Sequence, residues 1–293
     1  GTFSAGAGTQ LNLSGGNLSL KGATTFAGAT VGSASGRNLV LNGATSVSGL
    51  SVAGSAIVSN YATLTQSGGA ITLGDTVPAN RAAFFNSATG VWNIADDSGV
   101  AVGANAGSNI NNVGAFQKTG GSNTSTVYAS ISSSGSIAAN SGTLAFAGAS
   151  NSVSGALAGT GAILFSGGAT TLNDGASATV ASLGVSGAST TLTVATNLAY
   201  AGALTEGAGA KLAVNAGDTL TLSGTSSLSG SIGGAGGLAL AGGAATFSTG
   251  SSVSTATWSL SGAGTLATIG AALNYTGTFS AGAGTQLNLS GGN

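Results

Sequence analysis

Apolar and polar residues alternate over short stretches of this chain, and glycine interrupts the alternation every few residues. Residues 17–28 read NLSLKGATTFAG, and residues 38–49 read NLVLNGATSVSG. An apolar residue at every second position is typical of a β-strand with one buried face. The two stretches match without a gap at an offset of 21 (38 minus 17). We therefore expect short strands in a repeating unit of that length, with these residues in the core: Leu18, Leu20, Phe26, Leu39, Leu41 and Val47.

A unit of this length with two or three strands has the size of one coil of a β-solenoid. One coil cannot bury its own leucines, but stacked coils would place Leu18 over Leu39 and Phe26 over Val47 in continuous columns. Asn17 and Asn38, at equivalent corners, would then stack as an amide ladder. Helices are disfavoured because each interior glycine costs about 1 kcal/mol relative to alanine. The predicted fold is an all-β parallel β-solenoid of about 20-residue coils, and an array of β-sandwiches is the alternative.

Longer repeats enclose the short ones. Residues 277–293 repeat residues 1–17 letter for letter, which gives a period of 276 (277 minus 1) and indicates a tandem array. Two pairs of segments, 161–172 with 236–247 and 200–218 with 275–293, share an offset of 75 (236 minus 161, 275 minus 200). The larger period corresponds to about 13 coils, which would advance roughly 60 to 65 Å along the solenoid axis at the usual strand spacing. The smaller offset suggests a sub-repeat of about four coils.

The 21-residue repeat is less regular in one part of the chain, which suggests three regions. Residues 1–74 and 150–293 form regular coils, and 277–293 begins the next period. Residues 75–149 form variant coils with larger aromatic side chains and more charge. This variant region supplies the candidate partner-contact segment: Arg81, Trp92, Asp96, Asp97 and Lys118. Two interpretations stay open, a decorated coil that contacts a partner and a thicker coil whose aromatic side chains fill a wider core.

Composition excludes several classes of protein. Only 4% of the residues are charged and the net charge is −1, so the chain lacks the lysine and arginine that neutralise nucleic-acid phosphates. No run of about 18 apolar residues is present, so we expect no membrane-spanning helix in this segment. Cysteine and histidine are absent, which excludes disulfides and the usual zinc sites.

The sequence also offers little for catalysis. Because the chain contains no histidine, a nucleophile that is activated by histidine is excluded. Asp96 and Asp97 are adjacent, and consecutive residues of a strand point to opposite faces, so they would not flank one glycosidic bond. Asn93, Asp96, Asp97 and Asn105 could offer oxygen ligands to calcium, but a solvated turn is the simpler interpretation. We expect no enzyme activity, no catalytic residue, no cofactor and no metal.

Several motifs resemble the repeats of very large bacterial surface proteins. The block from Phe85 to Gly148 contains VGAFQKTGG and NSGTLAFAG, and a later stretch reads LNYTGTFSAGAGTQLNLSGG. These strings are similar to repeats of filamentous-haemagglutinin-type adhesins and autotransporter passengers. The resemblance implies a right-handed parallel β-helix, export through an outer-membrane pore, an extracellular or bacterial cell-surface location and a role in attachment. It transfers no catalytic residue.

The expected function is that of a structural repeat in a long secreted or cell-surface fibre, acting as a stalk or spacer in adhesion or biofilm. The expected partners are neighbouring repeats of the same protein, with lateral self-association as a further candidate. The alternatives are a self-assembling surface layer or sheath, and a solenoid that binds carbohydrate or ice through rows of threonine and asparagine.

Overall fold

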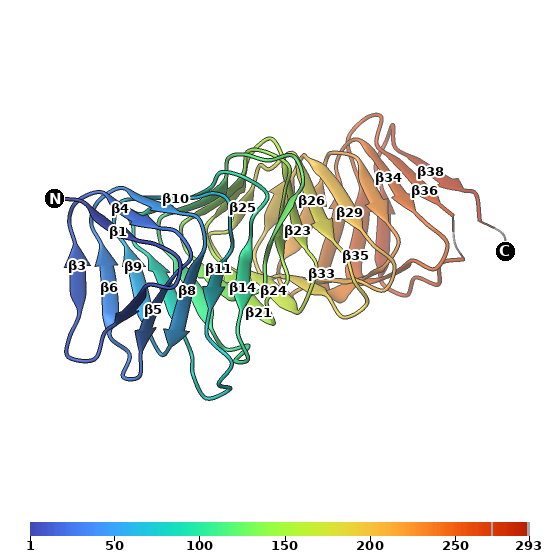
Figure 1. The fold of residues 1–293 in the computed structure, drawn as a ribbon. Helices are drawn as coiled ribbons and strands as arrows, with labels where there is room; N and C mark the ends of the chain where they lie inside the picture. The colour runs from blue at the N-terminus through green and yellow to red at the C-terminus, as the bar shows by residue number, and fades with distance from the viewer. Residues whose placement is uncertain (271, 292–293) are drawn as a thin grey trace. The chain divides into compact units, whose positions relative to one another are not determined.

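Short strands separated by glycine-containing turns build the whole of the described structure, a computed structural model that describes residues 1–270 and 272–291. Each coil carries three strands on three faces, and the strands pair in parallel with their counterparts in the next coil (Figure 1). The fold is a parallel β-solenoid of about 14 turns with coils of about 21 residues, which confirms the predicted class. It divides into two compact units, Gly1–Asn151 and Ser152–Asn293.

The first unit contains three rows of strands, one on each face. Face 1 consists of β1 (Phe3–Ala5), β4 (Thr24–Phe26), β7 (Thr45–Val47), β10 (Thr63–Gln66), β13 (Val91–Ile94), β16 (Ala115–Lys118) and β19 (Ser136–Ala139). Face 2 consists of β2 (Gln10–Asn12), β5 (Ala29–Ser33), β8 (Leu50–Gly54), β11 (Ile71–Leu73), β14 (Val100–Val102), β17 (Thr124–Val127) and β20 (Thr143–Phe146). Face 3 consists of β3 (Leu18–Leu20), β6 (Asn38–Leu41), β9 (Ile57–Asn60), β12 (Ala83–Asn86), β15 (Asn109–Asn112) and β18 (Ser130–Ser133), and β21 (Ser150–Val153) lies at the boundary of the units.

The second unit has the same plan with two long strands. Its shorter strands are β22 (Ala156–Ala158), β23 (Ala162–Phe165), β24 (Ala169–Leu172), β25 (Ser177–Ala178), β26 (Ser182–Val185), β27 (Thr191–Val194), β28 (Leu198–Tyr200), β29 (Ala203–Glu206), β30 (Lys211–Val214), β31 (Thr219–Leu222), β32 (Ser226–Leu228), β34 (Ala244–Phe247), β36 (Leu266–Ile269), β37 (Thr278–Ala281) and β38 (Gln286–Leu289). The long strands β33 (Ser231–Leu240) and β35 (Ser252–Leu260) each run around a corner. Thus β33 pairs with β30 over its first residues and with β31 over its last.

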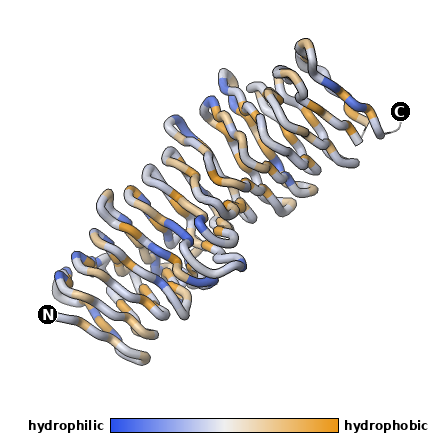
Figure 2. Tube along the Cα trace, turned by 90° about the horizontal axis from the view of Figure 1, so that it is seen from above, coloured by the Kyte–Doolittle hydropathy of each residue, from blue (hydrophilic) through white to orange (hydrophobic). Residues whose placement is uncertain are grey.

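The core is a set of apolar columns inside the coils. Strand β3 pairs with β6 so that Leu18 lies opposite Leu39, and β4 pairs with β7 so that Phe26 lies opposite Val47. Leu39, Leu41, Phe26 and Val47 are buried, whereas Leu18 and Leu20 are half-buried. Hydrophobic positions recur in coil after coil along each unit (Figure 2). Burying them excludes water from the columns, which is the main stabilising contribution in such a fold.

The number of residues per coil varies in the first unit, which explains why the 21-residue repeat is less regular there. Ile57 lies opposite Ala83 and Ala83 opposite Asn109, so the residue number rises by 26 over each of these two coils (83 minus 57, 109 minus 83). The extra length of the first of them belongs to the loop between β11 and β12, residues 74–82. The predicted boundaries at 74/75 and 149/150 are not tested by these findings and stay a prediction.

Segments that match in the sub-repeat with an offset of 75 residues do not lie on the same face of the solenoid. Strand β29 belongs to the row of β26 and β32, but its match in the sub-repeat, β37, pairs with β35 of another row. Likewise β30 matches β38 in sequence and lies in a different sheet from it. The offset therefore moves a pattern from one face to a neighbouring face and is not a whole number of coils. Gly292 and Asn293, the last residues of that alignment, lie outside the described residues.

Candidate functional site

The candidate partner-contact segment divides into buried and exposed residues. Trp92 and Lys118 are completely buried in the core of their coils, so a partner on the outer surface cannot contact their side chains. Arg81 is exposed in the loop between β11 and β12, where its guanidinium donates to the carbonyl of Gly107. Asp96 and Asp97 lie in the corner between β13 and β14.

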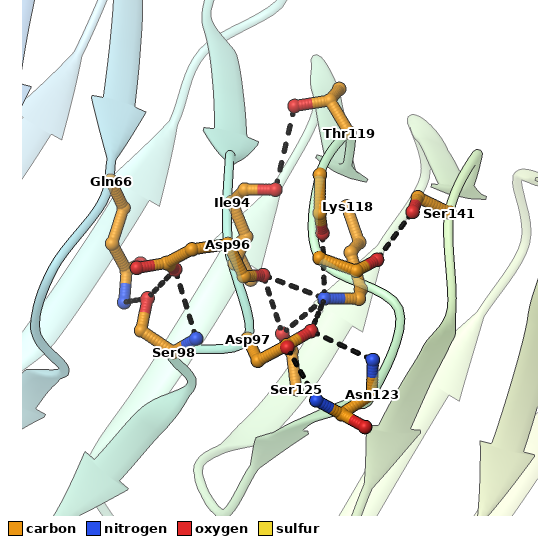
Figure 3. Close-up of polar contacts among 12 residues, drawn as sticks. Gln66, Ile94, Asp96, Asp97, Ser98, Lys118, Thr119, Asn123, Ser125 and Ser141 are labelled. Atoms are coloured by element: carbon orange, nitrogen blue, oxygen red, sulfur yellow. Dashed lines mark hydrogen bonds and ion pairs between the residues drawn. The ribbon is translucent and has the colours of Figure 1, made fainter.

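Lys118 is the centre of a polar cluster at that corner (Figure 3). Its Nζ donates to the carbonyls of Asp96 (2.6 Å) and Gly120 (2.8 Å), and it contacts Asp97 Oδ1 (2.9 Å) and Ser125 Oγ (3.0 Å). Four oxygen atoms surround one ammonium group, which offsets the cost of burying its charge. The cluster thereby joins the corners of two successive coils. In the strand register Lys118 lies opposite Ile94 and Ala139, so a cation replaces an apolar core residue.

The two carboxylates are held in place by separate partners. Burial opposes ionisation of Asp96, but its bonds from the Ser98 hydroxyl and from the Gly68 and Ser98 amides lower its pKa below the usual value. The Lys118 ammonium, followed by the Asn123 side chain, lowers the pKa of Asp97. Both residues lie in a bend between β13 and β14 and not in a strand, so their separate partners, and not strand alternation, set the directions of the two carboxylates.

Trp92 lies in an aromatic column within the first unit. Its ring centroid lies 4.2 Å from that of Phe84 and 5.0 Å from that of Phe116, and its Nε1 donates to Gln66 Oε1 (3.0 Å). Offset and edge-to-face contacts of this kind add to the burial of apolar area. These aromatic side chains fill the core of the variant coils.

Buried asparagines form a ladder at the corner that follows face 3. Asn60 Nδ2 donates to Asn86 Oδ1 (2.8 Å), Asn86 Nδ2 donates to Asn112 Oδ1 (2.8 Å), and Asn112 Nδ2 donates to Ser133 Oγ (2.9 Å). The expected amide ladder of Asn17 and Asn38 is wrong: Asn17 Oδ1 instead accepts from the backbone amide of Asn38 (2.9 Å). The reason is that Asn17 precedes its strand and caps the next coil from an exposed turn. The equal spacing of Asn60, Asn86 and Asn112 was the signal that sequence reasoning missed.

The oxygen atoms considered for calcium do not converge. Asn93 Oδ1 accepts from Gln117 (2.6 Å), and Asn105 Oδ1 accepts from the Gly107 amide (2.8 Å) in another loop. Asp75 is also engaged, because its carboxylate accepts from the amides of Val77 and Gly54 and from Asn80, which lowers its pKa. Within residues 1–270 and 272–291 no three acidic side chains lie close enough together to hold a metal ion.

Glu206 is a buried carboxyl that the sequence analysis did not single out. It ends β29 with a side chain only 1% exposed, opposite Val185 and Leu228 in the register. Its Oε2 accepts from the Gly230 amide (3.2 Å), and its Oε1 has no hydrogen-bond partner. Burial raises the pKa of Glu206 to about 7, and interactions with backbone amides, that of Gly230 first, only partly counteract this.

These features define a repeat solenoid whose buried polar clusters form hydrogen bonds within and between its own coils. In the described part of the chain, no helix is long and apolar enough to cross a membrane. Comparisons with protein-family models, with curated proteins and with solved structures found no match.

Proposed function

We propose that this chain is a structural repeat of a long secreted or cell-surface fibre, where it acts as a stalk or spacer in adhesion or biofilm. The observation that carries the proposal is the repeated register: the described strands continue the row of an earlier coil by parallel pairing. Repetition of this kind gives length, since each coil contacts only its neighbours and further coils can be added.

The polar groups support a structural role. The Lys118 cluster and the asparagine ladder both satisfy backbone or side-chain groups of adjacent coils. Such contacts hold one coil on the next and engage the polar atoms of Lys118, Asn86 and Asn112 within the fold. Adhesion itself would then belong to another part of the fibre or of its assembly.

Electron microscopy of the native material on the cell surface would test this proposal. We expect single thin fibres with an axial repeat of roughly 60 to 65 Å, the advance of about 13 coils. A continuous sheet or lateral bundles would favour the surface-layer alternative. The absence of any fibre carrying this chain would contradict the proposal.

A ligand-binding solenoid is the second candidate, and one feature favours it. On the outer side of the second unit, Thr205, Ser227, Thr246 and Thr268 lie opposite one another in successive coils. This row of hydroxyl groups could face a polysaccharide or ice. Retention on immobilised glycans, or thermal hysteresis of the purified chain, would support this function over that of a spacer. Both properties should be lost when Thr246 is replaced by a bulky charged residue.

A further inference from the structure

The seventeen-residue repeat occurs twice in the chain, in two different settings, and the structure describes its second copy as far as Gly291. Strands β1 and β2 carry it in the first unit, and β37 and β38 carry it in the second. The turn between the two strands has a similar conformation in both copies. The Thr9 amide donates to the Gly6 carbonyl (3.1 Å) as the Thr285 amide does to Gly282 (3.4 Å). Gly8 and Gly284 have φ values of 77° and 76°.

The first copy shows how this segment binds the coil that follows it. Strand β1 pairs with β4, and β2 pairs with β5, so that Phe3 lies opposite Thr24 and Leu11 opposite Val31. The Phe3 amide donates to the Ala23 carbonyl (2.9 Å), and the Leu13 amide donates to the Gly32 carbonyl (2.8 Å). In return, the carbonyls of the segment at Ala5 and Thr9 accept from Ala27 and Thr30 (both 2.9 Å).

The second copy shows how the same segment binds the coil that precedes it. Strand β37 pairs with β35, β38 pairs with β36, and the Phe279 ring lies 5.1 Å from that of Trp258. Here the amides of Gly282, Gln286 and Ser290 donate to the preceding coil (2.9 Å each). The carbonyl of Gly284 accepts from Gly264 (3.0 Å).

The two sets of backbone groups do not overlap. Contact with the following coil uses the positions of Phe3, Ala5, Thr9 and Leu13, whereas contact with the preceding coil uses those of Gly282, Gly284, Gln286 and Ser290. One segment can therefore make both contacts at once. Burial agrees with this reading: Leu13 is 6% exposed beside its following coil, while the identical Leu289 is 74% exposed.

We propose that the edge formed by β37 and β38 binds the coil that opens the next period of the array, which repeats residues 18–60 and lies against this edge as β4 and β5 lie against β1 and β2. The register is fixed by the first unit: Phe279 opposite the repeat of Thr24, Ala281 opposite that of Phe26 and Leu287 opposite that of Val31. The aromatic column then continues from Trp258 through Phe279 to the residue of the next period that repeats Phe26, as Phe3 contacts Phe26 in the first unit. This inference rests on the proposed function and deepens it, because it defines the junction between successive periods.

The test is to extend the full chain after Asn293 with a second copy of residues 18–60. We expect amide hydrogen exchange at Phe279 and Leu289 to slow by a factor of about ten or more, because both amides gain carbonyl acceptors. The matched control carries Phe26→Asp and Val31→Asp in the added segment only, and it should restore the original rates. Unchanged exchange at these two amides, or an added segment without protection, would overturn the proposal.

A second measurement identifies the source of the partner copy. Because β1 and β2 already pair with β4 and β5 in each copy, light scattering of the unextended chain should show constant mass at rising concentration. Head-to-tail growth that Leu289→Asp suppresses would mean that separate molecules exchange these strands, and it would overturn a junction between covalently successive periods. Constant mass together with a protected extension would assign the junction to covalently successive periods. The result is distinguishable from a failure of the proposed function, since the extension can dock in solution even where microscopy finds no fibre on cells.

Discussion

At the scale of single residues, Glu206 gives the chain a dependence on pH. Its carboxyl is buried, and its pKa of about 7 lies above the ordinary value of 4.5. Between these two pH values the folded chain holds a proton that the unfolded chain has released. The free energy of unfolding therefore falls as the pH rises from about 4.5 to about 7, and stays low above that range.

We expect this loss to be about 3 kcal/mol, from roughly 1.4 kcal/mol per pKa unit. Urea denaturation at pH 5 and at pH 8 would measure it. The control is Glu206→Gln, which keeps the shape of the side chain and removes the titration, so its stability should not fall over this range. Asp75, Asp96 and Asp97, whose pKa values are lowered, titrate below the range. Equal pH dependence in both chains would show that Glu206 is ionised at little cost.

Lys118 is the second residue whose removal should be informative. Replacement of Lys118 by Met would leave the carbonyls of Asp96 and Gly120 and the Ser125 hydroxyl without their donor. We expect a loss of roughly 3 kcal/mol in the free energy of unfolding, as for other buried charges deprived of their network. The control is Gln117→Met on the same strand, which removes one hydrogen bond to Asn93 from a half-buried side chain and should cost only about 1 kcal/mol. If Lys118→Met left the free energy of unfolding unchanged, the hydrogen bonds of the cluster would only offset the cost of removing the Lys118 ammonium from water.

At the scale of elements, the asparagine ladder ties corners of neighbouring coils together. Asn86→Ala would remove the central rung, leave Asn112 Oδ1 buried without its donor, and leave Asn60 Nδ2 with only the Val91 carbonyl (3.3 Å) as acceptor. We expect a loss of about 3 kcal/mol, since each unsatisfied buried group costs about 1 to 3 kcal/mol. Asn111→Ala, an exposed change on a neighbouring strand, should lie within about 0.5 kcal/mol of the original chain. Thermal denaturation of both variants would compare them, and similar midpoints would contradict a stabilising ladder.

The strands and their stacking could be predicted from sequence because period-2 alternation acts locally. The alignment of 17–28 with 38–49 placed Leu18 over Leu39 as the structure does. Lys118 and Glu206 could not be placed in this way, because a charged residue in an alternating pattern is normally assigned to the solvent side. Their burial depends on carbonyls and amides from other coils, such as those of Asp96 and Gly230.

The face on which a strand lies is also beyond a local pattern. Segments that match in the longer sub-repeat, such as those of β29 and β37, lie in different sheets. An apolar residue that points inward is buried equally well on any of the three faces. The alternating pattern therefore predicts a strand but does not predict which face of the solenoid the strand belongs to. The number of residues in the turns between strands decides on which face the next strand lies, and that number varies, as in the loop of residues 74–82.

At the scale of the whole molecule, the two units can be followed separately because each contains one tryptophan. Trp92 belongs to the first unit and Trp258 to the second, and both are buried. The variants Trp258→Phe and Trp92→Phe would therefore report on one unit each by fluorescence. Since coils interact with their nearest neighbours, a local defect should be felt most by the unit that contains it.

Leu39→Asp is such a defect, because it places a carboxylate in a fully buried column of the first unit. Burial of an unpaired charge should cost several kcal/mol and should open coils near β6 to protease. We expect the denaturation midpoint reported by Trp92 to fall clearly more than the midpoint reported by Trp258. The control is Val40→Asp, whose side chain is half-buried on the outer side of the same strand and should shift neither midpoint by much. Equal shifts of the two midpoints would instead mean that the coils unfold as one cooperative block. Stability would then not be a sum over coils, and a fibre built from these periods would unfold as a whole and not locally.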